Sequence, residues 1–331
     1  MLFAAATGLA PIAAFLFSRK KQLATRIITD GSTDRAREVP RVVLPDGSRL
    51  FDERAARFAQ LAEGHPMGAY LALMAQVARG QCNALAGRAA GPVPEAALEA
   101  SRSYGMPPLS AQGHARHPIW RDDLRDILDA VRAGAATGVL PALDRLAAAD
   151  AASLEAVADR LLAGATLDAD AADVPFVGAA LQVYFARQAA SLAAADVSHC
   201  DVATVCPVCG TRPVASIIRV GGVQAGLRYL VCALCQTEWN MARVKCSSCE
   251  SDKGVHYLSL AQHEEADGTQ AAVKAEACDE CRTYLKIVNQ EKDPFADPGA
   301  DDLATLALDL LVDEQGLARS GPNLLFHPGS G

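Results

Sequence analysis

The chain has 331 residues, half of them apolar and 5% aromatic, with a formal net charge of −8. A chain of this length usually forms two or three domains, and its apolar half can supply a sizeable core. The negative charge argues against a nucleic-acid-binding protein, which needs a basic face to neutralise phosphates. Basic and acidic residues are nearly balanced within residues 201–290 as well, at nine and ten.

The N-terminal segment is apolar but is a poor candidate for a membrane helix. Residues 2–17 are interrupted by Gly8 and Pro11, and they are fewer than the ~20 residues that a membrane helix needs. The basic residues 19–21 follow the apolar run, whereas a secretory signal carries its charge before it. We therefore expect residues 1–35 to be a loose tail or the product of a wrongly chosen start, without stable membrane insertion. The alternative is a weak membrane anchor that leaves the body of the protein in the cytoplasm.

Residues 36–198 are predicted to form a helical domain, because alanine is abundant there and apolar residues recur at the spacing of a helix face. Four segments show this spacing: Met67 to Val77 after Pro66, Leu124 to Val131, Leu154 to Leu161 with Ser153 as the cap, and Phe176 to Phe185 after Pro175. The last of these helices is expected to be buried on more than one side.

Five residues outside the main cysteine motifs could be ligands but have simpler interpretations. His65, His114 and His117 lack the spacing of a zinc-protease motif, so we interpret them as capping or surface residues. Cys82 follows an apolar helical run and is interpreted as a small buried residue. Cys200 is expected to have a structural or surface role rather than to be a spare ligand.

Eight of the ten cysteines form four Cys-x-x-Cys pairs within a stretch of 76 residues. The pairs are Cys206 with Cys209, Cys232 with Cys235, Cys246 with Cys249, and Cys278 with Cys281. Two thiolates three positions apart fit a tight turn that points both sulfurs at one point. Two such turns make a four-sulfur cage for Zn²⁺ or iron. Eight ligands therefore indicate two mononuclear sites, of iron or zinc.

The separations between the pairs predict which of them share a site. The first two pairs are separated by 22 residues and the last two by 28, whereas only 10 residues lie between the second and third pairs. The simplest interpretation is two consecutive ribbons, at 199–243 and 244–290, each closing its own site. Strands are expected at 214–220, 227–231, 255–260 and 284–288, with hairpin turns at Gly221-Gly222 and Gly268. Interleaved pairing of the first pair with the third is the alternative.

Other cysteine chemistries fit this pattern less well. Disulfides need an oxidising compartment and usually serve small domains. A thioredoxin-like site uses one Cys-x-x-Cys at the start of a helix rather than four copies. Iron–sulfur clusters usually take a tight run of cysteines and a remote one.

The first pair is followed by a glycine, as in the cysteine turns of rubredoxin. Gly210 permits a positive φ, which lets backbone N–H groups point at sulfur and stabilise the thiolate charge. The same position holds Gln236, Glu250 and Arg282 after the other pairs. We expect these three turns to be less ideal, so the identity of the metal stays open.

The sequence does not indicate an enzyme. It contains no GxSxG, GxxxxGK[ST], HExxH or dinucleotide-binding motif, and the glycine-rich residues 221–226 are explained by a hairpin loop. A site closed by four cysteines offers no open position for hydrolysis. Such a site can be structural or, with iron, can carry one electron.

Residues 291–331 are predicted to pack on the body of the protein. An acidic, proline-rich loop at 293–302 precedes Leu303, Leu306, Leu310 and Leu311, which are expected to lie on one face of a short helix. Asp301 and Asp302 are placed to complement the N-terminal dipole of that helix. The extended residues 319–326 include three consecutive large apolar side chains, which should dock on the protein rather than face water.

The order of these motifs resembles the FdhE family of formate dehydrogenase accessory proteins. The resemblance is carried by His-Pro-Met-Gly-Ala-Tyr-Leu at 65–71, Cys-Pro-Val-Cys-Gly at 206–210, and the segments 213–216, 226–232, 235–240, 243–246, 275–278, 284–286, 301–309 and 319–323. It extends from about residue 40 to the C-terminus and leaves residues 1–35 outside.

The resemblance implies an α+β protein, with an α-helical N-terminal domain followed by two tandem rubredoxin-like, zinc-ribbon-type subdomains that bind metal through all eight cysteines. It implies a cytoplasmic, chaperone-like maturation factor rather than an enzyme, with the catalytic subunit of formate dehydrogenase as its partner and no nucleic acid. Iron is the metal that the family implies. The alternatives are a rubredoxin-type electron carrier that acts in cofactor maturation and a zinc-ribbon nucleic-acid adaptor. The sequence leaves the oligomeric state open.

Overall fold

The computed structural model describes residues 39–47, 49–113, 115–197, 202–260 and 271–327. Residues 39–331 group into one compact unit, separate from residues 1–38. The expectations for the N-terminal segment, His114, Cys200 and Gly268 fall outside the described residues. No helix within the described ranges is long and apolar enough to cross a membrane.

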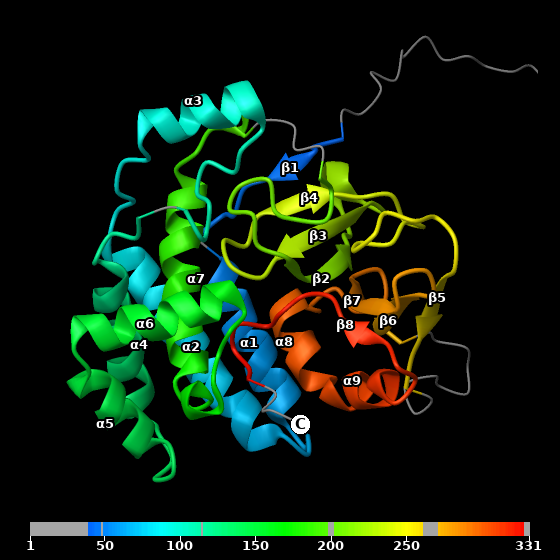
Figure 1. The fold of residues 1–331 in the computed structure, drawn as a ribbon. Helices are drawn as coiled ribbons and strands as arrows, with labels where there is room; N and C mark the ends of the chain where they lie inside the picture. The colour runs from blue at the N-terminus through cyan, green and yellow to red at the C-terminus, as the bar shows by residue number, and fades with distance from the viewer. Residues whose placement is uncertain (1–38, 48, 114, 198–201, 261–270, 328–331) are drawn as a thin grey trace, which may run out of the picture. The chain divides into compact units, whose positions relative to one another are not determined.

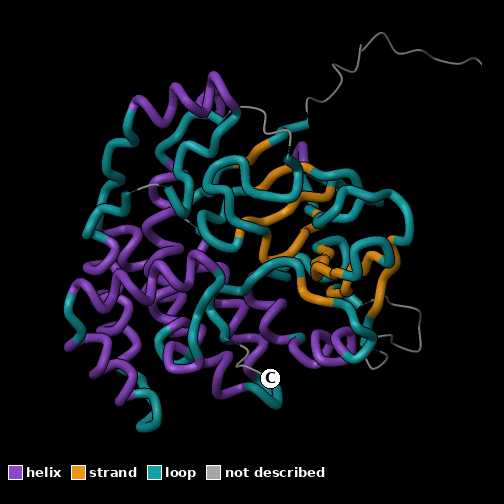
Figure 2. The backbone as a smooth tube through the Cα atoms, in the orientation of Figure 1, coloured by secondary structure: helices purple, strands orange, loops and turns teal. Residues whose placement is uncertain are grey.

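The first half of the described unit is helical, as predicted. Figure 2 shows most helices gathered on one side of this unit and most strands on the other. The helices are α1 (Leu50–Ala62), α2 (Gly68–Gly87), α3 (Glu95–Tyr104), α4 (Trp120–Arg132), α5 (Leu140–Ala148), α6 (Ala151–Ala163) and α7 (Val174–Ala190). Helix α7 packs against α2, α4 and α6, and its residues from Val174 to Ala189 are all buried. The prediction of a helix buried on several sides is therefore confirmed.

The apolar spacing of the helices matches the faces that they bury. In α4 the predicted residues Leu124, Ile127, Leu128 and Val131 are all buried. Helix α2 approaches α4 closely, since a Cβ on Gly80 would lie 2.9 Å from the Cα of Ile127. The predicted cap of α6 is wrong. Asp150 caps this helix by accepting a hydrogen bond from the N–H of Ser153, which lies inside the first turn.

Eight strands form a single sheet within the described residues, seven of them from the second half and β1 from the segment before α1. The order is β1-β4-β3-β2-β7-β6-β5, and β8 also pairs with β7, at Thr283 and Tyr284. The strands are β1 (Val42–Val43), β2 (Pro213–Ile218), β3 (Arg228–Cys232), β4 (Glu238–Asn240), β5 (Val255–Leu258), β6 (Val273–Cys278), β7 (Thr283–Asn289) and β8 (Ala318–Arg319). Neighbours are antiparallel except β2 with β7 and β7 with β8.

The two ribbons share this sheet instead of forming separate sheets. Parallel pairing of β2 with β7 joins them, with Ser216 opposite Ile287 and Ile217 opposite Val288. Both strands are buried along most of their length, so each needs neighbours that cover its edges and faces. Strand β6, with the sequence Val-Lys-Ala-Glu-Ala-Cys, was not predicted because few of its residues favour strands.

The C-terminal region contains two short helices where one was predicted. Helix α8 (Pro298–Ala304) ends before Thr305, and α9 (Leu306–Asp313) begins after it. At the break, the Lys286 ammonium donates hydrogen bonds to the carbonyls of Asp302 and Thr305, which also accept backbone hydrogen bonds from the N–H groups three residues further on. Leu303 is buried as expected, but Leu308 and Val312 form the buried face of α9. Leu310 and Leu311 are 69% and 48% exposed, so the expected leucine face shared with Leu303 and Leu306 is wrong.

The last described residues dock on the helices, as predicted. Figure 1 shows this segment, in red, running from β8 past α8 toward α7. Leu324 and Leu325 are buried, and the ring of Phe326 packs edge-on against Tyr70. A Cβ on Gly178 of α7 would lie 2.0 Å from the carbonyl oxygen of Leu324, so this close crossing requires glycine.

Candidate metal centres

The structure brings the eight predicted cysteines together as two groups of four. Cys206, Cys209, Cys232 and Cys235 form the first centre, and Cys246, Cys249, Cys278 and Cys281 form the second. Within each centre all sulfur atoms lie within 4.8 Å of one another. The groups are those expected from consecutive ribbons, and the interleaved alternative does not occur.

The sulfur spacing fits a tetrahedral metal site. Sulfur–sulfur distances are 3.5 Å for Cys206 to Cys235 and 3.3 Å for Cys209 to Cys232. In the second centre, Cys246 to Cys281 is 3.6 Å and Cys249 to Cys278 is 3.8 Å. Four sulfurs at about 2.3 Å from one metal ion would lie about 3.8 Å apart. Disulfides are much shorter, at about 2.0 Å, and the nine described cysteines are free.

The sheet explains why each pair of cysteine turns converges. In the first ribbon, β2 follows one turn and β3 leads into the next, and their antiparallel pairing places Pro213 opposite Cys232. In the second ribbon, β5 follows the third turn, and pairing of β5 with β6 places Val255 opposite Cys278. Each hairpin thus brings the second cysteine turn of its ribbon back beside the first turn, and the two turns together complete one centre.

All four turns adopt the same backbone conformation after the second cysteine. Gly210 has a φ of 76°, and Gln236, Glu250 and Arg282 have φ values of 63°, 61° and 57°. These three are the non-glycine residues with positive φ within the described ranges. We expected these turns to be less ideal, but they are not distorted. The left-handed conformation costs roughly 1–2 kcal/mol for a non-glycine residue, so it marks positions that the surroundings hold in place.

Side-chain contacts hold these three residues. The Gln236 amide donates to the carbonyls of Ala233 and Leu234, and its oxygen accepts a hydrogen bond from Arg54. Glu250 forms an ion pair with Lys245. Arg282 donates to the carbonyl of Gln315, at a distance of 2.6 Å.

Each turn also carries a hydroxyl residue two positions after the second cysteine, which we had not singled out. These residues are Thr211, Thr237, Ser251 and Thr283. In the first three turns, the N–H of the first cysteine donates to the carbonyl of this residue, at 2.8 to 2.9 Å. The hydroxyls of Thr237 and Thr283 also lie 3.2 and 3.1 Å from the sulfurs of Cys235 and Cys281. The repeated pattern Cys-x-x-Cys-x-Thr/Ser was the signal in the sequence.

Backbone amides point at sulfur in three of the turns. The N–H groups of Val208, Leu234 and Ser248 donate to the sulfurs of the first cysteines of their turns, at 3.3 to 3.4 Å. Such hydrogen bonds stabilise thiolate charge and tune a bound metal. With four sulfurs at tetrahedral spacing, the donor set of both centres fits zinc or iron.

The two centres differ in their exposure to solvent. All four cysteines of the first centre are buried, and burial raises the pKa of the Cys206 and Cys232 thiols well above the ordinary value. Four such groups can all be ionised together only beside a cation. In the second centre, Cys246 and Cys278 are buried, Cys281 is half-buried and Cys249 is exposed.

The histidines and the remaining described cysteine are placed as structural residues. The His65 ring bridges the N–H of Met67 and the carbonyl of Ala304, at 3.0 and 2.9 Å. His117 accepts a hydrogen bond from the N–H of Ile119 through Nδ1. Cys82 is half-buried against the main core rather than fully buried.

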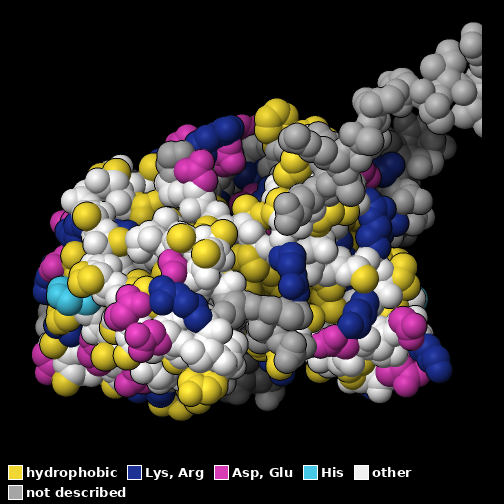
Figure 3. Space-filling model, turned by 90° about the horizontal axis from the view of Figure 1, so that it is seen from above, with side chains coloured by type: hydrophobic (Ala, Val, Ile, Leu, Met, Phe, Trp, Pro, Cys, Tyr) yellow, Lys and Arg dark blue, Asp and Glu magenta, His cyan; other side chains and the backbone are white. Residues whose placement is uncertain are grey.

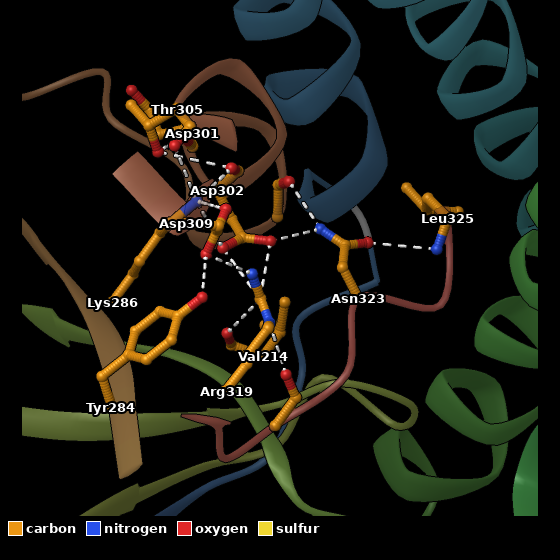
Figure 4. A network of polar contacts seen from close by, with 12 residues as sticks. Val214, Tyr284, Lys286, Asp301, Asp302, Thr305, Asp309, Arg319, Asn323 and Leu325 are labelled. Carbon is orange, nitrogen blue, oxygen red and sulfur yellow. Dashed lines mark hydrogen bonds and ion pairs between the residues drawn. The ribbon is translucent and has the colours of Figure 1, made fainter. Parts of the chain in front are cut away.

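A buried polar network beside the second ribbon was not anticipated (Figure 4). Both carboxylate oxygens of Asp302 accept hydrogen bonds from Arg319, and one also accepts from the amide of Asn323, all at 2.8 Å. The Lys286 ammonium lies 3.3 Å from Asp302 and 2.5 Å from Asp309. Asp302 and Lys286 are fully buried. We expected Asp302 to complement a helix dipole. Instead, it belongs to a network that joins β7, α8, α9 and the C-terminal segment.

Comparisons with known proteins agree with this architecture. Family models described as FdhE N-terminal, FdhE central domain and FdhE C-terminal domain match residues 39–201, 205–243 and 244–326. A protein FdhE homolog of Edwardsiella ictaluri is 42% identical over 87% of this chain and 92% of its own length. A homolog of Pseudomonas aeruginosa is 41% identical over 92% of this chain and 98% of its own.

A solved structure gives the same result for the fold. The crystal structure of the FdhE protein from Pseudomonas aeruginosa matches with a TM-score of 0.79 and 42% identity, over 88% of this chain and 100% of that one. Sequence and structure therefore agree over nearly the whole described part, and the chain belongs to the FdhE family.

Proposed function

We propose that this protein is a cytoplasmic accessory factor that binds the catalytic subunit of formate dehydrogenase during the assembly of the active respiratory enzyme. Membership of the FdhE family over residues 39–326 is the observation that carries this proposal. On this account the protein acts by binding and has no enzymatic activity of its own.

The eight cysteines are proposed to be the ligands of two metal ions. The chain contributes tetrahedral sulfur positions, together with N–H and hydroxyl groups that stabilise thiolate charge at the sulfurs. Because four protein ligands fill each centre, the ion has no open position for substrate. With zinc such a centre stabilises the ribbon, and with iron it can also carry one electron.

A rubredoxin-type electron carrier is the second candidate. The exposure of Cys249 and the partial exposure of Cys281 favour it, because an electron acceptor could approach the second centre. Metal analysis and spectroscopy separate the two candidates. Four thiolates around ferric iron give a red protein with a reversible one-electron couple, whereas a zinc protein is colourless and has no such couple.

A nucleic-acid adaptor has less support. On the face shown in Figure 3, basic and acidic side chains lie beside one another with apolar side chains between them. Several arginines are also neutralised by partners, including Arg219 by Glu238 and Arg228 by Glu276. We therefore expect no tight binding of duplex DNA at ~150 mM salt, where non-specific phosphate contacts are weak.

Isolation of the tagged full chain from cells grown on formate tests the proposed partner. Mass spectrometry should identify the formate dehydrogenase catalytic subunit in the purified sample, and deletion of the gene should abolish formate dehydrogenase activity. The untagged strain is the control. Recovery of nucleic acid in a salt-sensitive manner, with no dehydrogenase subunit, would overturn the proposal.

A further inference from the structure

We propose that the second centre exchanges its metal with small external thiols through displacement of Cys249, whereas the first centre retains its metal. The inference rests on the metal binding proposed above. It assigns different roles to two centres that the cysteine spacing alone makes look equivalent.

The first centre is enclosed by the helical half of the protein. Its four sulfurs belong to the main hydrophobic core. The N–H groups of Leu109 and Ala111, in the loop after α3, donate to the carbonyls of Val208 and Cys209, both at 2.9 Å. This loop therefore covers the first cysteine turn.

The second turn of the first centre is held by two helices. The Gln182 amide of α7 donates to the carbonyl of Ala233 at 2.9 Å. Arg54 of α1, which is 2% exposed, donates to the Gln236 oxygen at 2.8 Å. An external ligand can reach these sulfurs only after helices separate from the sheet, which requires local unfolding of the main core.

The second centre lies outside that core. The cluster of buried apolar residues around its ribbon is separate and small, consisting of Ala275, Ala277, Tyr284, Leu308, Val312 and Leu317. The turn at Cys246 and Cys249, which is the third cysteine turn of the chain, leads into β5. This is the edge strand of the sheet, and its residues are half-buried or exposed. The Lys245–Glu250 ion pair beside this turn has side chains 35% and 33% exposed, and such pairs contribute little to stability.

The two turns of the second centre differ in exposure. The fourth turn lies between the paired strands β6 and β7, and Arg282 ties it to the end of α9 through Gln315. The third turn carries the exposed Cys249. Cys249 is therefore the ligand that an incoming thiol meets first and displaces with the least disturbance of the protein.

The exchange step is a ligand substitution without a redox change. An incoming thiol releases its proton to solvent as its sulfur bonds to the metal. The bond between the metal and Cys249 breaks, and the Cys249 thiolate takes up a proton from solvent. The metal keeps its charge, and the remaining three cysteines hold it until further thiols complete the transfer.

Metal release from the full chain loaded with two equivalents of zinc tests the inference. The protein is mixed with excess glutathione and a coloured zinc chelator, and iodoacetamide labelling followed by peptide mass spectrometry identifies the cysteines that become free. One equivalent should leave faster than the other by on the order of tenfold or more, because an enclosed centre opens only by local unfolding. Among the eight cysteines of the two centres, Cys249 should be labelled first.

Two variants with matching substitutions show which centre releases its metal fast and which releases it slowly. Cys249→Ser should remove or accelerate only the fast equivalent, and Cys209→Ser, at the corresponding position of the first centre, should affect the slow one. Equal release rates in the wild type, or labelling of Cys206 or Cys209 before Cys249, would overturn the inference. Failure to load two equivalents at the start would instead contradict the proposed metal binding itself.

Discussion

Replacement of Asp302 by asparagine should destabilise the protein strongly, although the side chain keeps its size. Asp302 is fully buried and faces both the Lys286 ammonium and the Arg319 guanidinium. The network is neutral in the wild type, because Asp302 and Asp309 balance these two cations. The variant leaves one buried positive charge without a counter-charge.

The expected loss follows from the burial of the partners. Removing one partner of a buried ion pair typically costs about 3–5 kcal/mol, because the remaining charge stays desolvated. Asp122→Asn is the matched control, since Asp122 and Arg125 form an exposed pair with side chains 48% and 64% exposed. An exposed pair contributes less than about 1 kcal/mol.

Urea unfolding of the metal-loaded protein, followed by circular dichroism, measures both changes. The double variant Lys286→Met with Asp302→Asn should lose less than the sum of the single losses, since it restores charge neutrality. A loss within about 1 kcal/mol for Asp302→Asn, similar to the control, would refute the argument that this network is a desolvated ion cluster.

Three further predictions concern the C-terminal segment, acid stability and the N-terminus. Gly178→Ala should displace residues 318–326 and speed amide hydrogen exchange there, because its Cβ would overlap the Leu324 carbonyl; Gly87→Ala, with open space around it, should not. Burial opposes the ionisation of Asp302, but Arg319 and Lys286 outweigh it and lower its pKa. A lowered folded-state pKa gives stability that is present above the unfolded value of about 3.9 and is lost as the pH falls through the folded value. The wild type should therefore lose more stability than Asp302→Asn below about pH 4, and equal losses would contradict this cause. A chain that starts at Val39 should bind two metal equivalents and keep the thermal midpoint of the full chain; loss of either would show that residues 1–38 contribute to the fold.

The cysteine centres could be predicted from the sequence because local geometry determines them. A Cys-x-x-Cys turn fixes two sulfurs, and a hairpin of 22 to 28 residues returns the chain to complete the set. Helices could also be predicted from the sequence where one face is buried, as for Leu124 and Val131 of α4. These features depend on contacts between residues that are near in the chain or related by a simple turn.

Features that depend on distant partners were not predictable in the same way. Strands β2 and β7 both have apolar sequences, but nothing in either segment indicates that they pair in parallel. Lys286 has the sequence environment of an ordinary strand residue, yet its ammonium binds the carbonyls of Asp302 and Thr305, where the C-terminal helix is broken. After the break, α9 buries Leu308 rather than Leu310.

The conformation of the cysteine turns shows a third limit. A positive φ is easily anticipated at Gly210 but not at Gln236, Glu250 or Arg282. At these positions the intrinsic preference of the residue is overcome by side-chain contacts with Arg54, Lys245 and Gln315. The repeat of the whole turn, including the hydroxyl residue, would have been a better guide than the glycine alone.

The metal content of the wild type and of the Cys206→Ser/Cys209→Ser variant tests the central claim of two separate four-cysteine centres most directly. Elemental analysis of the purified full chains should give two equivalents for the wild type and one for the variant, because only the first centre loses ligands. Loss of both equivalents, or of neither, would contradict the existence of two independent centres.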